Sequence, residues 1–256
     1  MSRIPSRRTF DRRLVTISND IKNRITTMGV LFVHDNIIDP SVLSADSTLI
    51  KAKGYVWHKS SMVEGVVPRS GIDTDAMWGF SHTKGWIFGY KLHLISSTGS
   101  IIVPLAADFT TANIPDNQMY SILTASLPFT IIRRTLYMSA DPGYDDHELY
   151  DLSTDMGFQL VCPVKRYKNT PADRIKLIEF YESDMGQTVY SFRSRSIEPL
   201  IGHIKSAFRI DPLPVRGYYR VCAIVLLSVL LYQLLVYYNC KTNKDNPMAI
   251  KYVLGT

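Results

Sequence analysis

The sequence contains few cysteines, and no two of them have metal-binding spacing. Cys162, Cys222 and Cys240 give an odd count and form no C-x-x-C motif. This pattern supports neither a disulfide framework nor a cysteine zinc site. We therefore expect each thiol to behave as a small apolar side chain in a reducing, cytoplasmic setting.

Long apolar runs are also scarce. The N-terminus is basic and lacks the apolar core of a signal peptide. One uncharged run, residues 221–238, reaches the lower length limit of a membrane-spanning helix. Gln233 and Ser228 lie within it and no second run resembles it, so a helix buried in a soluble domain is favoured over a single-span anchor. We expect no membrane partner.

The charge of the chain is basic but not extreme. A net charge of +6 favours polyanions as partners, because Lys and Arg can replace the counterions around phosphates. A hydrophobic content of 46% and a charged content of 20% are ordinary for a folded protein and exclude wholesale disorder. The basic residues concentrate in residues 1–24, which suit either a solvated face or an arm that follows phosphates.

Three neighbouring antiparallel strands are expected in the first half of the chain. Residues 42–53 are strand-like and carry Asp46 among small side chains, which leave room for a ligand. Residues 86–96 and 101–107 flank a tight turn and predict a hairpin. Residues 54–85, which lie between the first and second of these strands, lack periodicity and predict a long loop. Its aromatic and basic side chains could contact nucleic acid.

Asp141 stands where a further strand stops. The residues from about 129 to 140 predict a buried strand, and Pro142 and Gly143 follow the acid. A carboxylate at a strand end of an α/β sheet lies where ligands usually bind. An acid beside Pro-Gly is also typical of a turn cap, so other acids must converge on Asp141 for it to be functional.

Helices alternate with strands in the second half of the chain. Pro199 suits the first turn of a helix, which puts Glu198 at its N-terminus, with Lys205 on about the same face. Three antiparallel strands followed by this alternation predict a mixed α/β sheet with parallel additions. The expected helices are 118–126 (capped by Asp116 and Asn117), 147–156, 174–182 (ended by Gly186), 200–208 and 219–239, with a short strand at 158–164.

Four segments in this order resemble the catalytic domain of bacterial and archaeal insertion-sequence transposases of the DDE type. They read ADSTLIKAKG, GWIFGYKLH, SADPGYDD and RSRSIEPLIGHIK, and the resemblance covers about residues 42–235. It implies a ribonuclease-H-like fold, in which three antiparallel strands and two parallel additions form a five-stranded mixed sheet with helices on both faces. The strand order derived above agrees with that topology.

The resemblance implies a metal-dependent reaction on DNA. Asp46, Asp141 and Glu198 are the implied catalytic residues and the ligands of two Mg²⁺ or Mn²⁺ ions, with Asp141 bridging both. Two such ions can activate an attacking oxygen and stabilise a leaving one, and carboxylates are the hard ligands that they prefer. The implied activity is DNA cleavage and strand transfer at the ends of an insertion sequence. Asp145 and Asp146 are expected to cap a helix.

The family also shows a Tyr, Arg, Glu and Lys signature around its third acid. Tyr190, Arg193 and Lys205 match it, but the spacing from Arg193 to Glu198 is one residue longer than usual, so Arg195 is an alternative. These side chains are expected to hold DNA phosphates. The implied partners are double-stranded DNA, both terminal inverted repeats and target, and a second copy of the chain in the DNA complex, in a nucleoid-associated location.

The expected domains are a basic N-terminal arm and helix (1–40), a catalytic domain (41–240) and a tail (241–256). Family members usually carry a sizeable DNA-binding region before the first aspartate, and here only 45 residues precede it. The arm is interpreted as a possible remnant of that region. Two alternatives to an active transposase stay open: a catalytically impaired DNA-binding remnant, and a ribonuclease-H-like nuclease that only hydrolyses.

Overall fold

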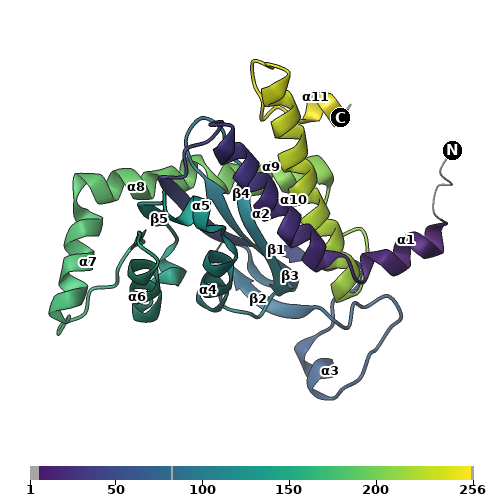
Figure 1. Cartoon of the computed structure of the whole chain (residues 1–256). Helices are drawn as coiled ribbons and strands as arrows, with labels where there is room; N and C mark the ends of the chain where they lie inside the picture. The colour runs from purple at the N-terminus through teal and green to yellow at the C-terminus, as the bar shows by residue number, and fades with distance from the viewer. Residues whose placement is uncertain (1–5, 82, 255–256) are drawn as a thin grey trace.

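A mixed six-stranded sheet forms the centre of the computed structural model, which describes residues 6–81 and 83–254 (Figure 1). The third strand pairs with the first along one edge and with the fourth along the other, both antiparallel, and the first, fifth and sixth strands are parallel neighbours. The strands are β1 (Val42–Lys51), β2 (Met77–Ser81), β3 (Gly85–Ser97), β4 (Pro104–Thr111), β5 (Tyr137–Ser139) and β6 (Gln159–Val161).

The order β4-β3-β1-β5-β6 confirms the expected ribonuclease-H-like arrangement, and β2 is an addition to it. β2 pairs with the first residues of β3, beyond the part that β4 covers. Residues 54–85, expected as a loop, therefore contain a strand as well as the short helix α3 (Lys59–Val63).

Helices cover both faces of the sheet. Lys91 of β3 pairs with Leu49 of β1, and paired residues point to the same face of the sheet. Leu49 is three positions from Asp46, and side chains alternate along a strand, so Lys91 and Asp46 point to opposite faces. Lys91 contacts α4 (Asp116–Ser126), whereas Ser44, on the Asp46 face, contacts the start of α9 (Ile197–Phe208). The remaining helices are α1 (Arg7–Leu14), α2 (Ser18–His34), α5 (Phe129–Ile132), α6 (His147–Asp155), α7 (Ala172–Glu182), α8 (Asp184–Arg195), α10 (Tyr218–Lys241) and α11 (Lys251–Leu254), with a 3-10 turn η1 (Pro142–Tyr144).

The long apolar run forms α10, which packs against α2, β4 and α9. It is the helix in the described residues with the length and hydropathy of a membrane span, and 56% of its most apolar stretch is buried inside the protein. Gln233 is fully buried on it, and its side-chain amide donates to the carbonyls of Ile25 (3.0 Å) and Pro104 (2.7 Å). A polar side chain in this helix thus ties α2 and β4 together.

The N-terminal segment shares the core of the sheet. Ile21, Ile25 and Phe32 of α2 are fully buried in the same hydrophobic cluster as the strands. The domain boundary expected at residue 40 stays a prediction, but α2 packs as part of the central layer. The exposed arginines of this segment lie mainly on α1.

Two other sequence-based predictions of secondary structure are wrong. Residues 129–132 form the helical turn α5, because an apolar run of this length can be buried as a helical turn as well as a strand, and β5 is only three residues long. Gly186 does not end a helix but lies in α8, where an added Cβ would be 2.0 Å from the carbonyl oxygen of Phe180. This glycine permits the close approach of α7 and α8.

Candidate active site

One cavity of about 430 Å³ is lined by all three acids that were predicted to be catalytic. Asp46 comes from β1, Asp141 lies two residues beyond the end of β5, and Glu198 lies in the first turn of α9. Residues 95 and 57 positions apart are thus brought to one place, because β1 and β5 are parallel neighbours and α9 packs across β1. The sheet topology creates this site.

Asp46 is the most enclosed of the three acids. It is 8% exposed, and its Oδ1 accepts from the Ser47 amide at 2.8 Å while its Oδ2 accepts from Arg193 Nη2 at 2.9 Å. Burial raises the pKa of the Asp46 carboxyl to about 7, although Arg193 and the Ser47 amide act against the shift. A carboxyl in this environment is stabilised in its charged form by any further cation that enters the cavity.

Asp141 combines the two roles that its sequence context allowed. Its Oδ1 accepts from the Gly143 amide at 2.8 Å and so caps η1, and the same residue lines the cavity. Burial raises the pKa of the Asp141 carboxyl. A Cβ at position 143 would lie 2.9 Å from Oδ1, so glycine lets the turn close onto the carboxylate.

Arg193 joins the other two acids. Its Nη1 donates to Glu198 Oε1 at 2.7 Å and its Nη2 donates to Asp46 Oδ2. The Glu198 side chain is 47% exposed, whereas that of Arg193 is only 17% exposed. The planar guanidinium therefore acts as a fixed cation between two carboxylates.

The donor set suits a hard divalent cation, although the acids are not gathered as a ligand cluster. Among residues 6–81 and 83–254, no group of three His, Cys, Asp or Glu side chains is close enough to hold a metal ion. Arg193 holds a positive charge between Asp46 and Glu198 instead. Carboxylate oxygens around a position that already favours a cation match the preference of Mg²⁺ or Mn²⁺.

The other predicted DNA-binding residues lie in different environments. Lys205 Nζ donates to the Leu49 carbonyl (2.6 Å) and to Asp211 (3.1 Å), and burial lowers its pKa against the effect of Asp211. Tyr190 packs edge-on against Tyr181, and Arg195 is exposed. Of the four, Arg193 reaches the described lining of the cavity. Which of them contacts DNA stays a prediction.

Sequence reasoning missed an ion pair that lines the cavity. Lys91 of β3 is 9% exposed and donates to Asp116 Oδ1 (2.9 Å) and to the Ile114 carbonyl (2.8 Å). Asp116 is therefore held by an ion pair and is not the N-cap of α4. Pro115 occupies the N-cap position and makes no side-chain cap bond. The signal was a lysine inside an otherwise apolar strand, since a buried lysine requires a partner.

The two acids that follow Asp141 differ in role. Asp146 caps α6 by accepting from the Glu148 amide at 3.2 Å, as expected. The same expectation is wrong for Asp145, whose side chain is 1% exposed and pairs with Arg174 of α7. The Lys165 amide also donates to Asp145 at 2.9 Å, which ties this loop to the chain after β6.

Comparisons with known proteins bear on the whole domain. A family model described as the transposase DDE domain matches residues 38–234. No curated protein matches the chain. Similar solved structures include a Mos1 transposase paired-end complex with left transposon end, at 10% identity and a TM-score of 0.25, covering 76% of this chain and 62% of that one.

Two further structures show the same loose likeness. A Mos1 mariner paired-end complex with Mn has 12% sequence identity and a TM-score of 0.28, and the match covers 85% of this chain and 61% of that one. A pre-cleavage Mos1 transpososome has 10% identity and a TM-score of 0.27, and the match covers 84% of this chain and 63% of that one. The chain thus spans under two thirds of the length of these proteins. The likeness is too loose to carry an argument, and the fold assignment depends on the strand order itself. The family match extends from the residues before β1 into α10 and contains all three acids, and on this basis the chain belongs to the transposase DDE domain family.

Proposed function

We propose that this protein is a DNA transposase that cleaves and joins DNA strands at the ends of an insertion sequence with the help of divalent metal ions. The observation that carries the proposal is the cavity in which Asp46, Asp141 and Glu198 meet within a transposase DDE domain. DNA strand cleavage and transfer are phosphoryl transfers, which need positioning and charge stabilisation rather than a covalent nucleophile from the protein.

The three carboxylates would hold the metal ions. Two bound Mg²⁺ or Mn²⁺ ions supply activation of the attacking oxygen and stabilisation of the leaving oxygen. Support comes from the Arg193 cation between Asp46 and Glu198, which marks the place as favourable to positive charge. Among the solved structures, one Mos1 complex is described with Mn.

Arg193 has a second role in this proposal. Its Nε is buried and has no hydrogen-bond partner among the described residues, while both terminal nitrogens are held by acids. Asp46 and Glu198 would hold a bound metal ion in place of the guanidinium. The Arg193 donors would then be free to bind the oxygens of a DNA phosphate, which arginine binds in a bidentate manner.

Double-stranded DNA is the proposed substrate, and basic surfaces extend from the site. A neighbouring cavity of about 680 Å³ is lined by aromatic and basic side chains, including Trp78, Trp86 and Lys84. Lys84 also lines the catalytic cavity, and Lys59 lies 3.4 Å from the centre of the Trp86 ring. Aromatic rings beside cations suit nucleic acid.

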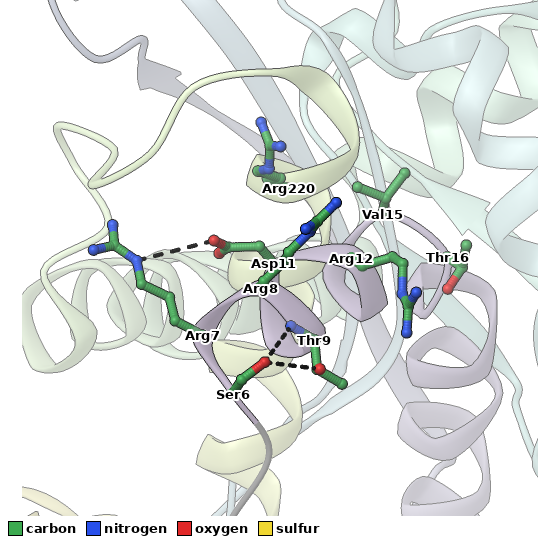
Figure 2. Close-up of a pocket in the computed structure, with 9 residues that line it drawn as sticks. All are labelled: Ser6, Arg7, Arg8, Thr9, Asp11, Arg12, Val15, Thr16 and Arg220. Atoms are coloured by element: carbon green, nitrogen blue, oxygen red, sulfur yellow. Dashed lines mark hydrogen bonds and ion pairs between the residues drawn. The ribbon is translucent and has the colours of Figure 1, made fainter.

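The α1 surface adds a second basic region. A pocket on this surface is lined by Arg7, Arg8 and Arg12 of α1 and by Arg220 of α10, and Figure 2 shows Asp11 among them, paired with Arg7. Such a surface suits phosphates at a distance from the cavity. We propose that two copies of the chain act together on the two DNA ends of the element, near the nucleoid.

Cleavage of the protein's own element ends tests the proposal. The full chain is incubated with duplex DNA that carries the terminal inverted repeats flanking its gene, together with Mg²⁺ or Mn²⁺. We expect nicked and joined products that disappear in Asp141→Ala and persist in the control Asp151→Asn, whose side chain is 71% exposed on α6. Binding without any cleavage by the unmutated chain, or products that survive Asp141→Ala, would contradict the proposal, and cleaved but never joined DNA would indicate hydrolysis alone.

A further inference from the structure

A buried serine lies two residues before each of the three acids. Ser44 precedes the acid of β1, Ser139 precedes the acid after β5, and Ser196 precedes the acid of α9. Their exposures are 0%, 0% and 1%. Buried hydroxyl groups are costly unless they are hydrogen-bonded, so three of them at matching positions require partners.

The three hydroxyl groups bond to one another. Ser196 Oγ donates to Ser44 Oγ at 3.2 Å, Ser44 Oγ and Ser139 Oγ are 2.7 Å apart, and Ser139 Oγ donates to the carbonyl of Leu43 at 3.3 Å. Ser196 Oγ is also the donor to the Phe192 carbonyl at 2.6 Å, which fixes it to α8. Because a hydroxyl has one proton, the Ser196 proton is shared between Phe192 and Ser44, and the three groups form one connected chain between α8 and β1.

This chain joins the three elements that carry the acids. Ser44 and Ser139 are register partners in the parallel pairing of β1 with β5. Residues two apart on a strand point to the same face about 6.6 Å from each other, so Ser44 lies one pleat below Asp46. Ser196 sits at the junction of α8 and α9, with φ −118° and ψ −80°, and therefore sets where α9 begins.

We propose that Ser44, Ser139 and Ser196 are positioning residues, whose hydroxyl chain sets the placement of β5 and the start of α9 relative to β1. The catalytic consequence rests on the proposed function, since it concerns the acids assigned there. The chain fixes elements that are 95 and 57 residues apart at the catalytic acids, and buried polar networks select one arrangement where apolar contacts tolerate several.

The test compares serine-to-alanine variants with a matched control. Ser153→Ala in α6 also removes a fully buried hydroxyl with two partners, the Tyr120 hydroxyl (2.9 Å) and the Leu149 carbonyl (2.7 Å), but it touches none of the three elements. Each variant of the full chain is measured by thermal unfolding, by amide hydrogen exchange, and by metal-dependent DNA cleavage at a temperature where all are folded.

We expect effects that cross from one element to another. Ser44→Ala should raise amide exchange in residues 192–199, far away in sequence, and Ser196→Ala should raise it in residues 137–142. Each should lower kcat for cleavage by about 10- to 100-fold with little change in KM, because misplacement by an ångström costs rate rather than binding. Ser153→Ala should lose a similar amount of stability without either effect.

A double variant separates positioning from general destabilisation. Since Ser44 and Ser139 share one bond, the kcat of Ser44→Ala/Ser139→Ala should be no lower than that of the worse single variant. Multiplying losses would overturn the inference, as would serine variants that match Ser153→Ala in both exchange and kcat. If the unmutated chain cleaves no DNA, the proposed function fails, and the exchange results decide the serine chain by themselves.

Discussion

Two aspartate–arginine pairs in this protein look alike and differ in what surrounds them. Asp46 and Arg193 meet at the wall of a cavity, with the acid side chain 11% exposed. Asp145 and Arg174 meet at the first turn of α7, which carries the arginine, with the acid side chain 1% exposed. Both arginine side chains are 17% exposed, so burial of the cation alone does not separate the pairs.

The number of donors around each acid separates them. Asp145 accepts from Arg174, from the Lys165 amide at 2.9 Å and from the Tyr150 hydroxyl at 3.2 Å, so both of its oxygens have partners within the fold, and we call this pair saturated. Asp46 has one amide and a guanidinium that it shares with Glu198. A saturated pair holds the fold together, whereas a shared one can exchange its cation.

The largest expected difference concerns cleavage. Asp46→Asn should lower metal-dependent DNA cleavage about 1000-fold, because a lost metal ligand removes several kcal/mol of transition-state stabilisation. Its unfolding free energy should fall by less than about 1 kcal/mol, since a neutral side chain fits a site where burial already opposes the charge. Product formation and urea unfolding are measured on the same sample, and cleavage within threefold of the unmutated rate would break the comparison.

The opposite outcome is expected for the saturated pair. Asp145→Ala leaves Arg174 buried without its acid and should lower the unfolding free energy by about 3 kcal/mol. Urea unfolding measures this loss. The fraction that remains folded at low temperature should keep its kcat. An unchanged urea midpoint would show that the two pairs contribute equally to the unfolding free energy.

Removal of the shared cation tests the exchange directly. Arg193→Met should tighten Mn²⁺ binding in the absence of DNA by about 10-fold, since a charged hydrogen bond worth roughly 1.5 kcal/mol no longer competes for Asp46. Calorimetric titration of the folded protein measures the affinity. Arg174→Met is the matched control and should leave the affinity unchanged; weaker Mn²⁺ binding in Arg193→Met would contradict competition.

The smallest effect is expected next to the saturated pair. Asp146→Ala removes the cap of α6 and should lower the unfolding free energy by about 1 kcal/mol, with the cleavage rate unchanged. Thermal and urea unfolding check the stability. A loss as large as that of Asp145→Ala would mean that the loop after Asp141 is held as one unit rather than by two separate acids.

Local pattern provided the candidates for this site, and the resemblance to DDE transposases grouped them as one site. Asp46 in a strand of small residues, and Asp141 at a strand end before Pro-Gly, are signals within a few residues of sequence, and both acids line the cavity. Glu198 was placed in a first helical turn by Pro199, and the helix begins there. These features are local, because strand alternation and helix starts depend on neighbouring residues.

The misses depend on partners that are remote in sequence. The pairing of Lys91 with Asp116 crosses from β3 to α4, and that of Asp145 with Arg174 crosses from a loop to α7. The strand expected from residue 129 failed because an apolar run of that length can be buried as a helical turn as well as a strand. Residues near each acid in the sequence could not reveal which basic side chain pairs with it.

The sequence by itself determined the order of the five predicted strands, the local placement of the three acids and the apolar character of α10, because periodicity and residue type carry that information locally. Only the tertiary structure decided that Arg193 lies between Asp46 and Glu198, that Asp145 is saturated, and that three serines bond beneath the acids. Desolvation and hydrogen bonding depend on what packs around a group, and those neighbours come from distant parts of the chain.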